Sequence, residues 1–326
     1  MRDHGGNLDW AVATYGGTVD AWLDLSTGIN ARPYPVPDLP ASAWSALPTQ
    51  TARSQLIEAA RAAYGTQAAI VPLAGAQAAI QLVPQLLPRG TARVLGPTYN
   101  EHAGALETYG WRVEEVRQLD DLAGADIAIV VNPNNPDGQM HRPEVLQAIA
   151  QYVGLLVIDE SFADPLPDLS LCPEVTPDTQ NLLIQRSFGK FFGLAGVRLG
   201  FAITGAKLAD RLSDLAGPWC VSGPALAVGQ AALADAIWQD RTRKNLVRDA
   251  TRLDALALRT GWTLVGGTPL FRTYATPDAA QAQETLAHQK IWTRRFEYSP
   301  QWLRLGLPGA ESQWARLEAA LLRPSK

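Results

Sequence analysis

Short apolar segments alternate with amphipathic segments between residues 70 and 203, and this alternation restricts the chain to few folds. The segments of strand length are residues 70–73, 93–95, 127–131, 155–158, 182–185 and 199–203. Apolar residues at helical spacing occur between several of them, over residues 77–87, 102–109 and 143–152. Strands that alternate with helices form a mostly parallel sheet with helices on both faces. We therefore expect an α/β fold that binds its ligand beyond the carboxyl ends of the strands.

The chain on either side of this region has other patterns. The first fifty residues are rich in Gly and Pro and show little periodicity, which predicts an extended arm. A helix is expected over residues 51–64, followed by further helices over 224–238 and 240–260 and then by a smaller α+β unit. The strands of that unit are expected at 262–265, 270–274 and 302–307, and its helices at 278–288 and 311–322. The predicted segments are thus an N-terminal arm with a substrate loop (1–48), a large domain (49–215), and connecting helices with a small α+β domain (216–326).

Composition favours a small-molecule function. The chain has 28 Lys and Arg against 32 Asp and Glu, a net charge of −4, and no basic cluster that would attract nucleic acid. Its apolar runs are too short to cross a membrane, and its N-terminus lacks the apolar core of a signal peptide. Cys172 and Cys220 have no metal-ligand spacing and make a poor disulfide framework. We expect a cytoplasmic protein without a metal site, a nucleic-acid partner or a membrane partner.

The segment 187–200 has the features of a cofactor site. Lys190 lies among small and apolar residues, with Ser187 three positions before it and Arg198 eight positions after it. Desolvation disfavours the charged form of an amine, and a neutral amine attacks an aldehyde to form a Schiff base. A hydroxyl and a guanidinium are suitable ligands for a phosphate. A surface lysine beside a glycine-rich turn is the alternative interpretation.

Two other polar positions follow predicted strands. Asp159 comes directly after the strand 155–158, and a buried carboxylate there needs a positive partner such as a protonated pyridine nitrogen. An N-cap or a salt bridge is the alternative for this residue. Asn135 lies in a turn, residues 132–138, that two prolines and Gly138 make rigid. Its amide is suited to donate to an anionic ring oxygen, although Asn in turns commonly serves the backbone alone.

Two further strands end in motifs that suit a phosphorylated ring. Gly75, Ala76 and Gln77 precede a predicted helix, whose N-terminal N–H groups and dipole favour an anion. This motif matches neither the dinucleotide-binding pattern nor the P-loop. Tyr99 follows the strand 93–95, where an aromatic side chain can stack on a planar ring.

In their joint order these residues resemble the pyridoxal-phosphate enzymes of the aspartate aminotransferase fold (fold type I), over essentially the whole chain. The most specific motifs are residues 132–138, Asp159 with Glu160, and Ser187-x-x-Lys190 followed by Arg198. The resemblance implies a three-layer large domain that binds pyridoxal 5'-phosphate, a smaller α+β domain and a homodimer. It implies that Lys190 forms the Schiff base, Asp159 pairs with the pyridine nitrogen, Asn135 contacts the ring hydroxyl oxygen, Tyr99 stacks on the ring, and Ser187, Arg198 and the Gly75-Ala76-Gln77 backbone hold the phosphate.

Within this fold the chain is most similar to the threonine-phosphate decarboxylases of cobalamin biosynthesis, which are relatives of the histidinol-phosphate aminotransferases. Residues 4–7 (His-Gly-Gly-Asn), 24–30 and 218–221 carry this similarity. It implies a lyase that converts L-threonine O-3-phosphate to (R)-1-amino-2-propanol O-2-phosphate, and a histidinol-phosphate-type aminotransferase is the alternative. The residues that it implies for substrate binding are His4, Gly5, Gly28, Asn30, Arg294 and Arg304.

Several details remain open or depart from the family pattern. A disordered N-terminal loop is the alternative for His4, and either Arg294 or the adjacent Arg295 faces the substrate. Phe162 stands where aminotransferases of this fold have Tyr, which favours the decarboxylase subgroup. Gly28 replaces an expected Asn, so the resemblance implies no side-chain contact from that position. The sequence does not distinguish threonine phosphate from serine phosphate.

Overall fold

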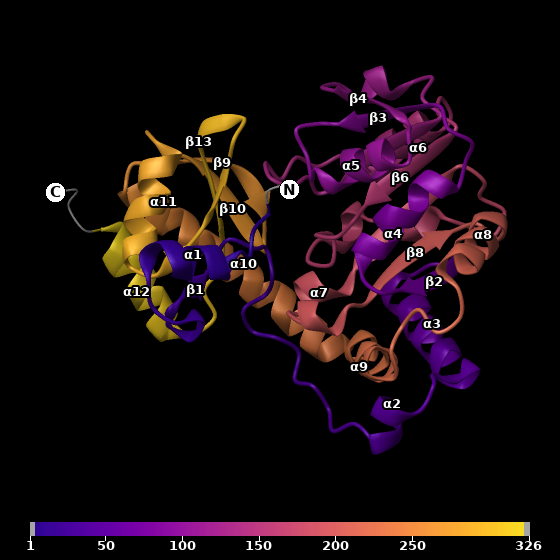
Figure 1. Cartoon of the computed structure of the whole chain (residues 1–326), viewed down its shortest axis with the longest axis horizontal. Coiled ribbons are helices and arrows are strands. Elements are labelled where there is room, and N and C mark those ends of the chain that lie inside the picture. The colour runs from indigo at the N-terminus through magenta and orange to yellow at the C-terminus, as the bar shows by residue number, and fades with distance from the viewer. Residues whose placement is uncertain (1–3, 323–326) are drawn as a thin grey trace. The chain divides into compact units, whose positions relative to one another are not determined.

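The computed structural model describes residues 4–322 and divides the chain into two compact units (Figure 1). The first unit contains the described residues of Met1–Pro33 and Arg241–Lys326, together with the short segment Pro136–Gln139. The second unit contains Tyr34–Asn135 and Met140–Asp240. The units combine parts of the chain that are distant in sequence, whereas the segments 1–48, 49–215 and 216–326 are contiguous. Those segments remain a prediction.

The second unit is built around a seven-stranded sheet with the order β2-β8-β7-β6-β5-β3-β4. Its strands are β2 (Ala69–Leu73), β3 (Thr91–Leu95), β4 (Arg112–Val116), β5 (Ile127–Val131), β6 (Leu155–Asp159), β7 (Leu182–Ser187) and β8 (Gly200–Thr204). Only β8 pairs in antiparallel fashion, with β2 and with β7, and the remaining pairs are parallel. The expected α/β fold with a mostly parallel sheet is therefore confirmed. Strand β4, which carries Arg and Glu side chains at the sheet edge, has no clear apolar pattern and was missed by the sequence analysis.

The direction of the chain across the sheet reverses between β3 and β5. Helix α5 (Glu101–Thr108) leads from β3 to β4 at one edge, while α6 (Pro143–Ala150) leads from β5 to β6 toward the opposite edge. Because crossovers between parallel strands are right-handed, these two helices lie on opposite faces of the sheet. The turns that follow β3 and β5 therefore border a topological switch point, where ligands bind in open α/β sheets.

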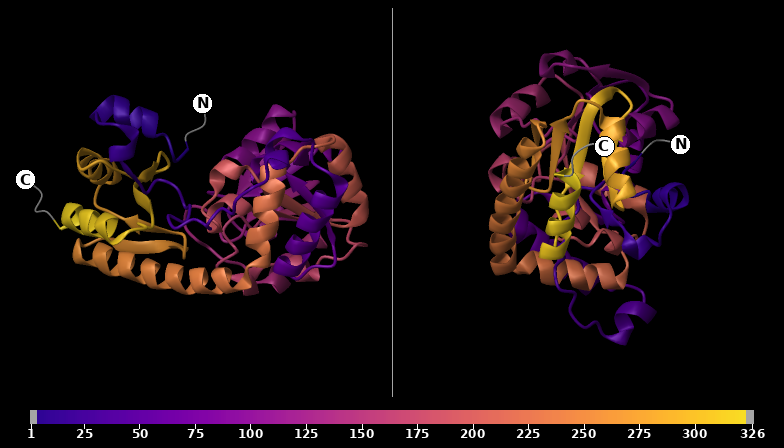
Figure 2. Two further views of the ribbon diagram at one scale, coloured as in Figure 1. Left: turned by 90° about the horizontal axis from the view of Figure 1, so that it is seen from below. Right: turned by 90° about the vertical axis from the view of Figure 1, so that its left-hand side faces the viewer.

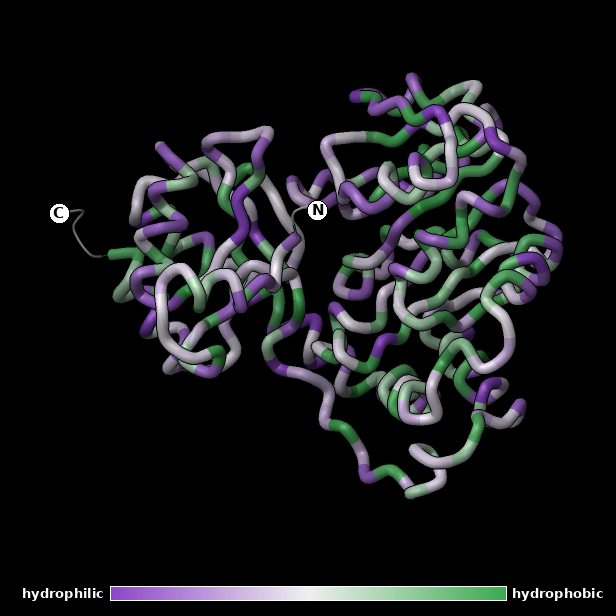
Figure 3. Tube along the Cα trace, in the orientation of Figure 1, coloured by the Kyte–Doolittle hydropathy of each residue, from purple (hydrophilic) through white to green (hydrophobic). Residues whose placement is uncertain are grey.

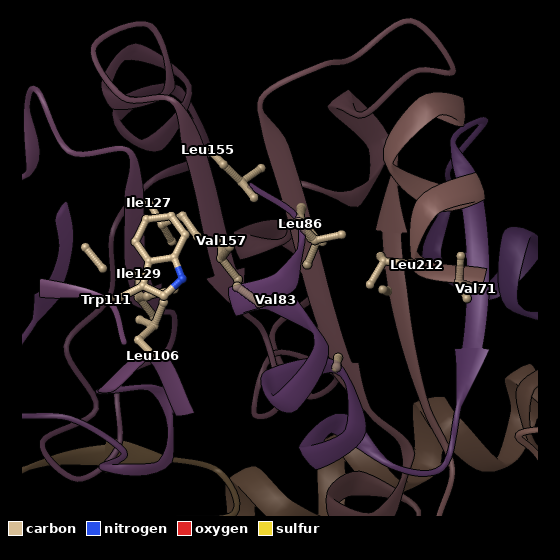
Figure 4. Close-up of a cluster of buried hydrophobic side chains, with 14 of the residues drawn as sticks. Val71, Val83, Leu86, Leu106, Trp111, Ile127, Ile129, Leu155, Val157 and Leu212 are labelled. Atoms are coloured by element: carbon tan, nitrogen blue, oxygen red, sulfur yellow. The ribbon is translucent and has the colours of Figure 1, made fainter. Parts of the chain in front are cut away.

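One face of the sheet carries a large apolar core. Figure 4 shows part of it, with Ile129 beside Trp111 on one side and Val71 beside Leu212 on the other. Helices α4 (Ala76–Leu82), α5 and α8 (Ala206–Ala216) contribute Ala79, Leu106 and Leu212 to the same cluster. Figure 3 shows the central strands as largely hydrophobic, as expected for strands that are covered on both faces.

The other face is covered by α3 (Gln50–Tyr64), whose Tyr64 ring lies 5.7 Å from the ring of Phe201 on β8. Thr49 caps α3 by accepting a hydrogen bond from the N–H of Ala52, and Gly65 ends it in the left-handed conformation. These caps agree with the helix predicted over 51–64. The unit also contains α2 (Ala41–Ser45), α7 (Phe188–Phe191) and α9 (Gly223–Ala234).

The first unit contains a four-stranded antiparallel sheet with the order β12-β13-β10-β9. Its strands are β9 (Thr263–Thr268), β10 (Phe271–Ala275), β12 (Arg294–Phe296) and β13 (Ser299–Gly306), and its helices include α11 (Ala279–His288) and α12 (Glu311–Leu321). Helix α10 (Ala236–Arg259) runs along one face as a single long helix (Figure 2), and its Asp254 accepts hydrogen bonds from Arg272 and Tyr274 of β10. The expected smaller α+β fold is confirmed in this unit.

The expectation of an extended arm over the first fifty residues is wrong at two places, because α1 (Leu8–Tyr15) and α2 are helical. Asn7 caps α1 by accepting from the N–H of Trp10, and the helix buries Ala11 against Trp22 and Trp292. The helix is one short amphipathic segment between glycines, so the Gly-rich composition concealed it. The chain then forms β1 (Leu23–Asp24), which pairs in parallel with β11 (Ile291–Trp292).

None of the helices between residues 4 and 322 combines the length and the apolar character that crossing a membrane requires.

Candidate active site

Asp159 lies at the carboxyl end of β6 and is buried, with 3% of its surface exposed. Its Oδ2 atom is 2.9 Å from Nε2 of His102 on α5, and its Oδ1 atom accepts a hydrogen bond of 2.9 Å from the N–H of Ser161. His102 is itself buried, so the pair is shielded from water. The carboxylate is thereby fixed in one orientation at the end of the strand.

These contacts determine the charge on Asp159. Burial by itself raises the pKa of a carboxyl group. The hydrogen bond and the charge interaction with His102 lower this pKa, and so do the hydrogen bonds from Ser161. Together they outweigh the effect of burial, so the pKa of Asp159 lies below its ordinary value. Asp159 is therefore an ionised acceptor in a dry environment, which is suited to a cationic ring nitrogen.

The turns after β3 and β5 are connected by hydrogen bonds. Oγ1 of Thr98 donates to Oδ1 of Asn134 over 2.6 Å, and Nδ2 of Asn134 donates to the carbonyl oxygen of Pro97 over 3.0 Å. Tyr99 directly follows Thr98, and Asn135 directly follows Asn134. The connection therefore fixes the backbone at both predicted cofactor residues, across the topological switch point.

Lys190 lies on α7, directly after β7. Its Nζ atom is 5.6 Å from the ring centre of Phe162, which is buried with 5% of its surface exposed. Ser187 is the last residue of β7, and β7 pairs with β6 so that Gln185 is opposite Asp159. The amine, the hydroxyl and the carboxylate thus all lie at the carboxyl ends of two neighbouring strands.

Gly75 and Arg198 lie close together beside the N-terminus of α4, at a place that we name the recess. Gly75 has a φ of +87°, and a Cβ atom built on it would lie 2.8 Å from Nη2 of Arg198. A Cβ atom on Gly200 would lie 2.4 Å from the backbone nitrogen of Ala76. Glycine at both positions therefore leaves the guanidinium and the first helical N–H group next to each other, as a phosphate site requires.

The side chain of Gln77 forms hydrogen bonds to other residues, and its Oε1 atom accepts one of 3.4 Å from the Tyr99 hydroxyl. Its Nε2 atom donates to Oε2 of Glu101 on α5 over 2.9 Å. Gln77 can therefore serve the recess through its backbone N–H group, which is the role that the resemblance implies.

A buried ion-pair network lies at the same strand ends. Nη1 of Arg186 donates to Glu160 and Nη2 donates to Asp164, each over 2.7 Å. Arg186 precedes Ser187 and Glu160 follows Asp159, and side chains alternate between the faces of a sheet. The network therefore connects β7 to the segment after β6 from the side opposite to Asp159 and Ser187.

The predicted substrate residues lie in the first unit. Gly5 is close to Ser26, since a Cβ atom on Gly5 would lie 2.3 Å from the Ser26 carbonyl oxygen. That carbonyl oxygen accepts a hydrogen bond of 2.6 Å from Nη2 of Arg304. His4 is exposed and directly precedes Gly5. The N-terminal motif and Arg304 are thus neighbours in this unit.

Arg294 and Arg304 are directly opposite each other on β12 and β13. Opposite residues of an antiparallel pair have their side chains on the same face, whereas Arg295 is opposite Leu303 and lies on the other face. Of the two neighbouring arginines, Arg294 is therefore the one that shares a face with Arg304.

Gly28 and Asn30 are buried in the segment after β1. Oδ1 of Asn30 accepts a hydrogen bond of 3.0 Å from the N–H of Arg32. This oxygen therefore shapes the loop, and a role in substrate binding remains a prediction for both residues.

Sequence reasoning missed the residues that hold these groups in place. His102, Thr98 and Asn134 were not identified, although each is adjacent to or near a residue that was. The sequence did contain a signal for His102. This histidine follows Tyr99 by three residues and begins the predicted helix 102–109, so it lies near the end of the same strand, 93–95.

Comparison with known proteins agrees with this arrangement. Residues 42–321 match the family model for aminotransferase class I and II, and the chain belongs to this family. It is 42% identical to the threonine-phosphate decarboxylase of Pseudomonas aeruginosa over 329 residues, which are 99% of this chain and 98% of the relative. It is 41% identical to the threonine-phosphate decarboxylase of a Sinorhizobium species over 330 residues, with 98% and 97% covered.

The fold is also that of solved aminotransferases. The crystal structure of the histidinol-phosphate aminotransferase from Sinorhizobium meliloti in complex with pyridoxal-5'-phosphate superimposes with a TM-score of 0.86. The superposition covers 96% of this chain and 93% of that one at 19% sequence identity. At this identity the similarity establishes the fold of the chain.

Proposed function

We propose that the chain is a pyridoxal-phosphate-dependent decarboxylase that converts L-threonine O-3-phosphate to (R)-1-amino-2-propanol O-2-phosphate in cobalamin biosynthesis. The observation that supports this most directly is the identity of 42% with a threonine-phosphate decarboxylase over nearly the full length of both chains. The match extends over 99% of this chain and 98% of the relative.

The cofactor residues fit pyridoxal phosphate. At the recess the Arg198 guanidinium lies so close to Gly75 that a Cβ atom there would approach its Nη2 to 2.8 Å, which places a positive charge beside the start of α4. Asp159 provides a buried carboxylate, and Lys190 provides an amine at the next strand end. This set matches the three groups of the cofactor, which are the phosphate, the pyridine nitrogen and the aldehyde. Tyr99, Asn135, Ser187, Ala76 and Gln77 are assigned to the same cofactor.

Pyridoxal phosphate, when bound, supplies an electron-accepting ring that stabilises the negative charge left on Cα after carbon dioxide departs. Asp159 holds the proton on the ring nitrogen, and His102 keeps the carboxylate oriented toward it. The ring of Phe162 packs beside the Lys190 amine. Lys190 then delivers a proton to Cα, which replaces the lost carboxylate.

The substrate carries a phosphate and a carboxylate, and the paired arginines are suited to bind such anions. Arg294 and Arg304 are directly opposite each other on β12 and β13, and guanidinium groups bind phosphate and carboxylate with two parallel hydrogen bonds. We assign these two arginines, with His4, Gly5, Gly28 and Asn30, to the substrate.

The second candidate is an aminotransferase of the histidinol-phosphate type, since a solved enzyme of that name has the same fold. Aminotransferases of this fold use a tyrosine at the position of Phe162, where the hydroxyl contacts the cofactor ring. Phe162 has no hydroxyl, which supports the decarboxylase.

The two functions differ in their products. The purified enzyme with pyridoxal phosphate is incubated with threonine phosphate while carbon dioxide and the absorbance of the cofactor are followed. We expect continuous release of carbon dioxide with the cofactor remaining in its aldehyde form. Release of no gas, together with conversion of the cofactor to its amine form, contradicts the proposal and identifies the aminotransferase.

We also propose a cytoplasmic homodimer. The free thiols of Cys172 and Cys220 are consistent with a reducing compartment. In the second unit a hollow of about 390 Å³ is bordered by Pro48, Pro218 and Trp219, and 59% of the Trp219 surface is exposed. Trp219 adopts a φ of +57°, which is unfavourable for a residue with a side chain. An aromatic side chain presented in this way is typical of a protein interface.

A further inference from the structure

Ser26 connects the two parts of the predicted substrate site in the first unit, and no role has been assigned to it so far. It is fully buried. Its hydroxyl and its carbonyl oxygen each form a hydrogen bond to a different part of the chain, one near the N-terminus and one on β13.

The hydroxyl has a defined direction. Oγ of Ser26 donates its only hydrogen to Oδ1 of Asp24 over 2.6 Å, and the same carboxylate oxygen accepts from the N–H of Ser26 over 2.8 Å. The lone pairs of Oγ are therefore left to accept, and the N–H of Gly6 donates to Oγ over 2.7 Å. Because hydrogen bonds in a chain polarise one another, the bond from Oγ to Asp24 makes Oγ a stronger acceptor for Gly6.

The carbonyl oxygen faces the other way, toward Arg304. Nη2 of Arg304 donates to it over 2.6 Å, and the guanidinium carbon lies 5.2 Å from the ring centre of Phe271. Gly5 lies against the same carbonyl, since a Cβ atom at Gly5 would approach it to 2.3 Å. One residue thus fixes the backbone after His4 and the direction of the Arg304 guanidinium.

We propose that Ser26 is a positioning residue for substrate binding, which holds the His4-Gly5-Gly6 segment next to Arg304 through its hydroxyl and its carbonyl oxygen. This inference rests on the proposed function, because His4 and Arg304 are assigned to the substrate there. It extends that function to a side chain that does not itself contact the substrate.

Replacing Ser26 with Ala separates the two connections. The Ser26→Ala variant keeps the carbonyl oxygen for Arg304 and removes the acceptor of the Gly6 N–H group. We expect the KM for threonine phosphate to rise about five- to tenfold, as loss of one buried hydrogen bond implies, and kcat to change less than about threefold. Thr276→Val is the matched control, since it also removes a buried hydroxyl from the first unit, where Oγ1 donates to the Gln301 carbonyl oxygen over 3.1 Å. Its KM should stay within about twofold of the wild-type value.

A double-mutant cycle with His4→Ala distinguishes positioning from a general structural effect. If Ser26 acts through the N-terminal segment, Ser26→Ala raises KM less than about twofold once His4 has been replaced. The inference is overturned if Ser26→Ala leaves KM unchanged, or if the two effects on KM multiply.

Two precautions keep the outcome decisive. Circular dichroism checks that each variant folds, and if Ser26→Ala does not fold, Ser26→Cys, whose sulfur is only a weak acceptor for the Gly6 N–H group, takes its place in the cycle under the same criteria. Should the wild-type enzyme transaminate threonine phosphate instead of releasing carbon dioxide, the proposed function fails. The KM comparison is then made on that reaction and still decides the role of Ser26.

Discussion

The contact between His102 and Asp159 determines the charge at the cofactor end of β6. Both side chains are buried, and the distance of 2.9 Å between Nε2 and Oδ2 joins residues that are 57 positions apart in the sequence. Without this partner, burial would dominate and favour the neutral acid. His102, which was not among the predicted site residues, thus favours the ionised form of Asp159, the form that can pair with a cationic ring nitrogen.

Replacing His102 with Phe should reverse the effect of pH on stability at this site. In the wild-type protein the lowered pKa of Asp159 contributes stability that is present above the unfolded value of about 3.9 and is lost as pH falls through the folded value. In the variant burial raises the pKa, so the contribution is present below the unfolded value and is lost as pH rises. Urea unfolding of the cofactor-free protein between about pH 3 and pH 7 measures this difference.

The control for this experiment is His288→Phe, because His288 lies at the surface of α11. It should follow the wild-type pH dependence. If His102→Phe follows it as well, His102 does not determine the ionisation of Asp159.

At this scale the sequence was informative about residues that stand directly at strand ends. Lys190, Asp159 and Asn135 were identified because each follows a strongly apolar segment and belongs to a recognisable motif. Thr98 and Asn134 were not, because their hydrogen bond joins two separate turns and leaves no local pattern. The assignments of individual site residues remain predictions.

The elements of the second unit were predictable where their sequence is strongly periodic or apolar. Strands β5, β6 and β7 are buried along nearly their whole length, and a continuous apolar segment announces such a strand. Strand β4 alternates charged residues at an exposed edge, and α1 spans only eight residues, so neither gave a clear signal. The predicted helix begins at residue 77, whereas α4 begins at Ala76, with Gly75 as its N-cap.

The start of α4 offers a test of the phosphate recess. Gly75→Ala places a side chain at a φ of +87° and next to Nη2 of Arg198. We expect the variant to lose about 1–3 kcal/mol of stability through backbone strain and to bind pyridoxal phosphate more weakly, because the guanidinium must move. Chemical denaturation and cofactor titration by absorbance measure the two effects.

Gly124→Ala is a close control for this variant. Gly124 has a φ of +81°, and no described atom lies within 4 Å of a Cβ atom placed there. It should lose a similar amount of stability and keep the affinity for pyridoxal phosphate. If both variants bind pyridoxal phosphate with equal affinity, the recess is not part of the cofactor site.

The molecule as a whole is proposed to act as a homodimer, and its surface provides a test. Trp219→Ala removes the exposed aromatic side chain at the hollow of the second unit. We expect the dimer dissociation constant to rise by roughly tenfold or more, because large aromatic residues dominate the energy of interfaces. Light scattering after size-exclusion chromatography at several protein concentrations measures this change.

Tyr152→Ala serves for comparison, since 65% of Tyr152 is exposed and it does not border the hollow. Its dissociation constant should match that of the wild-type protein. A Trp219→Ala protein that dimerises as tightly as Tyr152→Ala would assign the interface to another surface.

The hydrogen bond between Ser26 and Arg304 has a consequence for how the protein is made. The two residues are 278 positions apart, and β1 has its partner strand only at Ile291–Trp292. During translation the ribosome must therefore synthesise nearly the entire chain before the N-terminal segment can take its native place. Lys190 and Asp159 have left the ribosome well before that moment. The residues assigned to the cofactor are thus present in the nascent chain earlier than the complete set assigned to the substrate.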